Sequence, residues 1–181
     1  KGNTVTFDKL CQVMTTEVEK RLDTYRNKWS SDYFNKTIQQ LAVGAIKYGM
    51  LASDNHKEIT FEASAWTSFE GDTGPYLMYS YARTQSILRK ATDIELSTDH
   101  IDFSLLTDTT EHELMRFLYD FNLNAMQACQ QYKPSVLAHY LFDMCKCFNR
   151  FYAKQSVLNA STDNLKQIRL LLLASFSTTL K

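Results

Sequence analysis

The chain has 181 residues, with 20 basic and 20 acidic side chains that cancel to zero net charge. This balance argues against a non-specific DNA-coating protein, in which basic residues outnumber acidic ones, so no DNA partner is expected. Hydrophobic residues make up 44% of the sequence, enough for a globular core, but no apolar run approaches the ~20 residues that a membrane-spanning helix requires.

Apolar residues recur at helical spacing along most of the chain, which holds only 5 Gly and 2 Pro. The spacing predicts helices over 7–28, 32–51, 76–91, 111–131, 134–152 and 164–181. Shorter elements are expected between them: an extended segment at 59–61, one or two helical turns at 64–69, and a connection with a short helical piece at 93–108. Together these elements predict an all-α protein, an antiparallel helical bundle with short connections.

Polar residues and breakers mark where the predicted helices begin. Thr6 or Asp8 is expected to cap the first helix, and Asp163 the last. Pro75 suits the first turn of a helix, where its missing N–H has no cost. Gly71 and Gly74 are expected to permit a backbone geometry that directs the following helix, although a plain surface turn fits the same residues.

The four cysteines and four histidines are expected to hold no metal, because their spacing matches no zinc-ligand pattern. Cys145 and Cys147 lie two residues apart, without a further Cys or His at ligand spacing beside them. We therefore interpret the cysteines as reduced, partly buried thiols of a cytosolic protein.

An aromatic and basic pattern lies in the helix over 76–91. Tyr76, Tyr79 and Arg83 are spaced by three and four residues, so they share one helix face. Phenol rings and a guanidinium on one face can stack on unpaired bases and bind phosphate. The same spacing is also typical of buried core residues, and the residues alone leave both interpretations open.

Further candidates lie on the last two helices. Tyr152 ends its helix after Asn149 and could be a half-buried structural residue, whereas Phe148 and Phe151 are expected in the core. Lys166, Arg169 and Lys181 could meet phosphates, but a solvated helix face explains them more simply.

Three stretches resemble class I arginyl-tRNA synthetases in the order expected for that family. The first is Lys1–Asp8, the second is Val43–Tyr48 together with Ser68–Arg83, and the third is Leu137–Tyr152 followed by Arg169-Leu170. The run Glu-Gly-Asp-Thr-Gly-Pro-Tyr in the second stretch is the most specific match. The resemblance is to the carboxy-terminal part of the family's enzymes, including the helical DALR anticodon-binding domain.

The resemblance implies a domain division at 1–66, a remnant of the catalytic body, and 67–181, the anticodon-binding domain. The His-x-Gly-His signature of ATP binding does not occur in the chain. No catalytic residue and no cofactor are therefore expected in this chain, which should be inactive alone. ATP and Mg would serve the whole enzyme, and Lys1 would neighbour its ATP loop.

The resemblance also implies that six residues contact tRNA: Tyr76, Tyr79, Arg83, Lys146, Asn149 and Tyr152. The expected partner is arginine tRNA, the expected location the cytoplasm and the expected state a monomer. Two alternatives remain open at this point: a helical module that binds a protein partner through its aromatics, and the anticodon domain of another class I synthetase, such as a cysteinyl enzyme.

Overall fold

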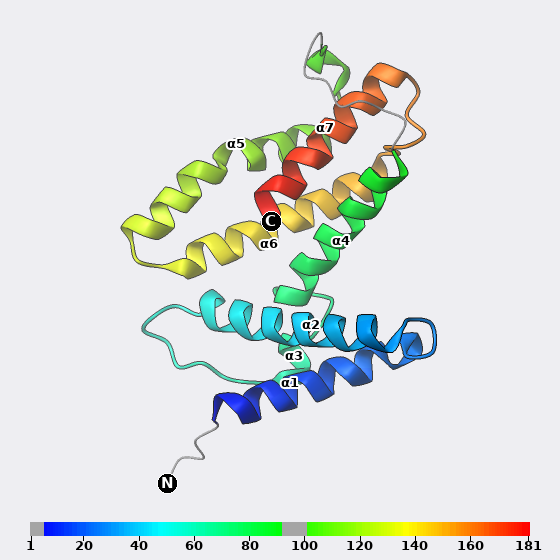
Figure 1. Cartoon of the computed structure of the whole chain (residues 1–181). Coiled ribbons are helices and arrows are strands. Elements are labelled where there is room, and N and C mark those ends of the chain that lie inside the picture. The colour runs from blue at the N-terminus through cyan, green and yellow to red at the C-terminus, as the bar shows by residue number, and fades with distance from the viewer. Residues whose placement is uncertain (1–5, 92–100) are drawn as a thin grey trace. The chain divides into compact units, whose positions relative to one another are not determined.

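A computed structural model describes residues 6–91 and 101–181, so the expectation for Lys1 lies outside the described residues. Within those ranges every regular element is helical, which confirms the all-α prediction (Figure 1). The elements are α1 (Phe7–Leu22), η1 (Asp23–Tyr25), α2 (Ser31–Ala52), α3 (Ala63–Trp66), α4 (Gly74–Lys90), η2 (Phe103–Leu105), α5 (Thr109–Gln130), α6 (Pro134–Lys154) and α7 (Asp163–Leu180).

The chain divides into two compact units, Lys1–Met78 and Tyr79–Lys181. The second unit therefore begins inside α4, which is continuous across the division. The domain boundary after residue 66, which the resemblance implied, stays a prediction.

The first unit is organised around α1 and α2, whose apolar faces share one core. The buried residues recur at helical spacing: Leu10, Met14, Val18, Leu22, Phe34, Ile38, Leu41, Ala42, Ala45 and Ile46. Thr6 caps α1 by accepting a hydrogen bond from the Lys9 N–H, as one of the two predicted caps. The apolar periodicity that identified both helices is thus the pattern that builds this core.

The turn before α4 is held against α2 by close packing and one hydrogen bond. The Tyr48 hydroxyl donates to the Asp72 carboxylate. A Cβ on Gly74 would lie 2.5 Å from the Gly44 carbonyl oxygen, which is backbone and cannot easily move. Gly71 has φ +84°, as predicted from the left-handed freedom of glycine, whereas Gly74 is required by contact distance instead.

In the second unit, α5 and α6 form an antiparallel pair and α7 packs with them (Figure 1). Phe148 and Phe151 of α6 are fully buried, as predicted, and Phe148 stacks on Phe176 of α7 with ring centroids 4.4 Å apart. Gln85 of α4 joins this core by a 2.5 Å hydrogen bond from its amide to the Ser177 hydroxyl. The bundle therefore has an aromatic centre and a polar link to α4.

Residues 59–61, which were expected to be extended, lie in neither a helix nor a strand. Two local predictions need correction. The helix predicted over 7–28 ends at Leu22 and continues as a short 3-10 turn. Thr162, not Asp163, caps α7 by accepting from the Leu165 N–H. Asp163 is the first helical residue, where its charge favours the positive end of the helix.

No helix in the described ranges is long and apolar enough to cross a membrane. All four cysteines are free thiols: Cys145 and Cys147 are buried, Cys11 is half-buried and Cys129 is exposed.

Candidate functional site

A hollow of about 470 Å³ lies on the surface of the second unit. Its walls come from one face of α4, from the end of α6 and from the loop that follows α6. The lining residues are Tyr79, Arg83, Ser86, Ile87, Lys90, Tyr152, Gln155, Ser156, Val157, Leu158 and Asn159.

The α4 side of the hollow follows from helical geometry. Tyr79, Arg83 and Lys90 are separated by four and seven residues, which places them in one row along the helix. Tyr152 comes from the last turn of α6, and the backbone N–H of Gln155 closes that turn on the Phe151 carbonyl at 2.8 Å. The two helices thus present one tyrosine each to the same hollow.

Arg83 joins the two tyrosines at the centre of the site. Its guanidinium carbon lies 4.5 Å from the ring centroid of Tyr79 and 5.0 Å from that of Tyr152, both within cation–π range. Its Nη2 also donates a hydrogen bond to the Tyr79 hydroxyl. A planar cation is therefore held within cation–π distance of two rings.

Asn149 fixes the orientation of this guanidinium. Its Oδ1 accepts from Arg83 Nη1 at 2.7 Å, and its Nδ2 donates to the Ser80 hydroxyl at 3.1 Å. Ser80 is fully buried in α4, so Asn149 links the half-buried Arg83 to a fixed point inside the unit. Such preorganisation lowers the entropy lost on binding a ligand.

The two tyrosines are accessible. Tyr79 is 43% exposed and Tyr152 is 41% exposed, whereas Phe148 and Phe151 of the same α6 are fully buried. The interpretation of Tyr79 as a core residue is therefore wrong. Each ring offers part of its surface to solvent and can accept a stacking partner.

The charge of the hollow is positive. Among the described residues that line it, Arg83 and Lys90 carry cationic groups and none carries a carboxylate. The loop after α6 completes the lining with both polar and apolar residues: Gln155, Ser156, Val157, Leu158 and Asn159. Rings, a guanidinium and an ammonium without a competing carboxylate suit a ligand that combines planar groups with anionic ones.

The structure assembles four of the six predicted contact residues: Tyr79, Arg83, Asn149 and Tyr152. Tyr76 is half-buried in the first turn of α4 and does not line the hollow. Lys146 of α6 also lies outside it, because its ammonium pairs with Asp143 at 3.2 Å and lies over the Phe142 ring. Roles for Tyr76 and Lys146 stay predictions.

Some lining residues were missed from the sequence. Ser86, Ile87 and Lys90 continue the row of Tyr79 and Arg83 at intervals of three and four, so helical spacing alone could have found them. The loop residues after Tyr152 carried no such signal, because the path of a loop depends on what anchors it.

Arg169 anchors that loop, and its prediction is wrong. It is neither on a solvated helix face nor free to meet phosphate, because it is only 8% exposed. Its Nε lies 2.7 Å from Glu111 Oε1, and its two Nη atoms donate to Ser156 and Gln155. The ion pair joins residues 58 positions apart, so spacing along the chain gave no indication of it.

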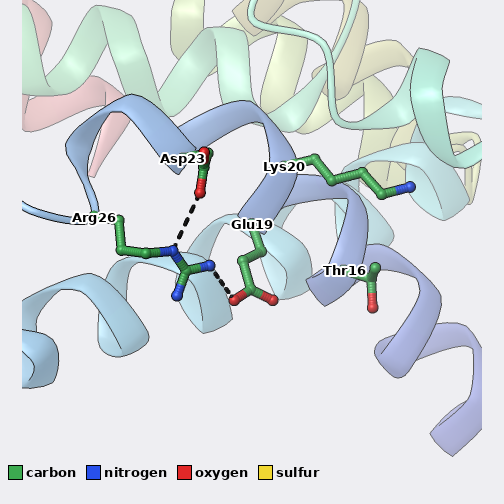
Figure 2. A pocket seen from close by; sticks show the side chains of 5 residues that line it. All are labelled: Thr16, Glu19, Lys20, Asp23 and Arg26. Carbon is green, nitrogen blue, oxygen red and sulfur yellow. Dashed lines mark hydrogen bonds and ion pairs between the residues drawn. The ribbon is translucent and has the colours of Figure 1, made fainter.

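A second hollow, of about 280 Å³, lies along α1 and η1 in the first unit (Figure 2). Figure 2 shows that Arg26 points between Glu19 and Asp23. The guanidinium nitrogens lie 2.5 Å from the Glu19 carboxylate and 3.1 Å from that of Asp23. These carboxylates raise the pKa of Arg26, first of all through the hydrogen bond to Glu19. The charged side chains of this second hollow thus pair with one another. They offer a ligand fewer unpaired charges than the hollow beside Arg83 does.

The buried thiols of the second unit have raised pKa values, which makes them unreactive. Burial raises the pKa of the Cys145 thiol to about 12 and that of Cys147 to about 11. Both stay protonated at neutral pH, so neither is a reactive thiolate. In the described ranges, no three His, Cys, Asp or Glu side chains are grouped to hold a metal ion.

The DALR anticodon binding domain family matches residues 77–181 of the chain. Among curated proteins, the arginine–tRNA ligase of Clostridium kluyveri is 34% identical over 183 residues, which cover 100% of this chain and 32% of the relative. That of Clostridium botulinum (strain Alaska E43) is 38% identical over 177 residues, or 97% of this chain and 30% of the relative. The chain thus spans about a third of the length of the curated relatives it matches.

Solved structures give the same result. The arginyl-tRNA synthetase of Thermus thermophilus superposes with a TM-score of 0.87 and 30% identity, over 99% of this chain and 30% of that protein. The arginyl-tRNA synthetase of Plasmodium falciparum superposes with a TM-score of 0.81 and 26% identity, over 98% of this chain and 31% of that protein. Both units of the chain therefore have counterparts in these enzymes.

Proposed function

Because the chain belongs to the DALR anticodon binding domain family, we propose that it grips arginine tRNA and reads its anticodon through the hollow beside Arg83. Its similarity along its whole length to arginine–tRNA ligases supports this substrate. The chain would be the carboxy-terminal part of such an enzyme, as the resemblance in its sequence implied.

One observation carries the proposal: Arg83 lies over the rings of both Tyr79 and Tyr152 in an open, cationic hollow. Proteins that recognise single-stranded RNA stack unpaired bases on aromatic rings and on arginine planes. Each base stacked on an aromatic contributes about 1–3 kcal/mol. Two exposed tyrosines would hold two splayed bases, and Lys90 would meet the adjoining phosphate.

For the whole protein we propose the ligation of L-arginine to its tRNA with ATP. ATP and Mg would be bound by parts of the enzyme other than this chain, whose sequence contains no His-x-Gly-His signature. The isolated chain would bind tRNA without activating arginine. A cytoplasmic location and a monomeric state remain part of the same proposal.

The test is a titration of the 181-residue chain with two transcripts: arginine tRNA, and the same tRNA with its anticodon bases replaced. We expect the native transcript to bind at least about tenfold more tightly, because each lost stack and base contact removes about 1 kcal/mol or more. Measurements at two salt concentrations separate the contribution of phosphate contacts, which weakens as salt rises. Equal affinity for both transcripts contradicts anticodon recognition by this chain.

The alternative function, a module that binds a protein partner, would use a different surface, on α5. Tyr119, Leu123 and Met126 follow one another at helical spacing on α5, and all three are well exposed. A salt-insensitive protein complex in the absence of tRNA affinity would favour this alternative. The reported relatives are all arginine enzymes, which leaves another class I synthetase without support.

A further inference from the structure

Arg169 of α7 is a buried cation that uses its donors on three different partners. It is 8% exposed, and its ion-pair partner Glu111 is 1% exposed, with 2.7 Å between Nε and Oε1. Nη1 donates to the Ser156 carbonyl at 2.8 Å, and Nη2 donates to the Gln155 side-chain oxygen at 2.7 Å. A guanidinium is suited to this task because its donors are fixed in one plane.

The two loop acceptors belong to the hollow described above. Gln155 and Ser156 both line it and come three and four residues after Tyr152. They follow the end of α6 directly. The bond from the Gln155 N–H to the Phe151 carbonyl closes the last turn of that helix, and the chain then leaves the helix. We call the loop from Gln155 to Asn159 the rim of the hollow. The side chain of Arg169 therefore holds the first two residues of this rim in place.

Glu111 fixes the other end of this link. Its second carboxylate oxygen accepts from the Asp108 backbone N–H at 2.9 Å, as one half of the capping box that starts α5. Burying two charges costs much of what their attraction returns, so an apolar pair of similar volume would stabilise the bundle as well. A buried pair with two directional bonds into one loop is better explained by the geometry that it imposes.

We propose that Arg169 is a positioning residue for RNA recognition, which holds the rim from Gln155 to Asn159 in the conformation that receives a nucleotide. The inference rests on the proposed function, because the rim matters only where the hollow binds RNA. Arg169 acts through Gln155 and Ser156, and does not touch the ligand.

Arg169→Lys is the informative variant. Lysine keeps the charge beside Glu111 and the fold, but its single nitrogen cannot also reach both the Ser156 carbonyl and the Gln155 amide. We expect a modestly lower melting temperature, because two charge-assisted hydrogen bonds within the fold are lost. We also expect about tenfold weaker binding of an arginine tRNA transcript, because the released rim must then be ordered when RNA binds. Lys166→Arg, on the same helix, is the matched control and should bind as the native chain does.

Two readouts separate positioning from a purely structural role. Hydrogen exchange should accelerate in the peptide over 155–159 of Arg169→Lys, while the peptides of α5 and α6 keep their protection. Gln155→Ala should also weaken binding and should add little in the Arg169→Lys background, because both changes release the same rim.

The outcomes are distinct. A native chain without affinity for arginine tRNA overturns the proposed function, whereas exchange at 155–159 still tests the anchor. Suppose instead that the native chain binds. The positioning role alone is then overturned if Arg169→Lys binds equally well, or if residues 155–159 are equally protected from exchange in both proteins. If Arg169→Lys fails to fold, Gln155→Ala in the native background replaces it: weaker binding supports the proposal, and unchanged binding overturns it.

Discussion

Arg83 and Asn149 join α4 to α6 by a hydrogen bond of 2.7 Å between Nη1 and Oδ1. Asn149 reaches Ser80 with its other side-chain atom, so it holds the guanidinium against the tyrosine rings from inside the unit. The stacking surface of the hollow therefore depends on a residue that has little surface of its own to offer a ligand.

Asn149→Ala is expected to weaken RNA binding through Arg83. The variant loses the bonds to Arg83 and Ser80, which should lower the free energy of unfolding by about 1–2 kcal/mol. It should also weaken the binding of an anticodon stem-loop about threefold to tenfold, because the guanidinium loses its fixed orientation. Binding titrations and denaturant unfolding measure the two effects.

The matched control is Asn124→Ala. Asn124 is half-buried on α5, and its side-chain amide donates to the Asp120 carbonyl one turn earlier on the same helix, at 2.9 Å. It should leave RNA affinity unchanged. Equal losses of affinity in both variants contradict a specific role for Asn149.

Gly74→Ala should destabilise the first unit. The new Cβ would lie 2.5 Å from the Gly44 carbonyl oxygen, and separating two backbones costs about 1–3 kcal/mol. Gly44→Ala should be much milder, since its Cβ would meet the sulfur of Met78, which can rotate away, and alanine favours a helix by up to about 1 kcal/mol. Thermal unfolding of both variants tests this, and a larger loss for Gly44→Ala contradicts the account.

Stability is expected to fall at alkaline pH. Burial raises the pKa of Cys145 to about 12, of Cys147 to about 11 and of Tyr140 to about 12, above their ordinary values of 9.0, 9.0 and 10.0. At pH values between the ordinary pKa and the raised pKa of each group, the folded chain keeps a proton that the unfolded chain releases. Their contribution to stability is complete below about pH 9 and is lost as pH rises through the folded-state values. The loss is up to about 1.4 kcal/mol per pH unit for each buried thiol and smaller for Tyr140, whose partial exposure lets solvent screen the effect.

Denaturant unfolding at pH 8 and pH 10 measures this loss. Cys145→Ala removes one of the titrating groups, so the difference between the two pH values should shrink in that variant even though its stability is lower at both. Cys129→Ala changes an exposed thiol and should keep the native difference. A pH difference that is the same in all three proteins contradicts the assignment to buried thiols.

Helical spacing predicted the long helices of this fold to within a few residues at most ends, because the residues that repeat along each helix also form the core. Leu10, Met14 and Val18 are examples, and all are buried as expected. The same spacing predicted that Tyr79 and Arg83 share a face. Only the structure could decide that this face is open, because burial depends on the helix packed beside it.

The errors have a common cause. Arg169 looked like a surface residue because Glu111, its partner, lies 58 positions earlier and no local pattern connects them. Lys146, which the resemblance implied as a tRNA contact, lies outside the hollow and pairs with Asp143, so its role stays a prediction. Contacts between distant segments decide such cases, and one sequence does not encode them in its spacing.

The central claim is that the rings of Tyr79 and Tyr152 stack on bases of the anticodon. The most direct measurement is the dissociation constant of an arginine-tRNA anticodon stem-loop for Tyr79→Ala, Tyr152→Ala and the control Tyr119→Ala, a tyrosine of α5 that is 87% exposed and outside the hollow. The account predicts that the first two bind about fivefold to a hundredfold more weakly, with native melting temperatures, and that the control binds as the native chain does. Native affinity in both Tyr79→Ala and Tyr152→Ala would contradict it.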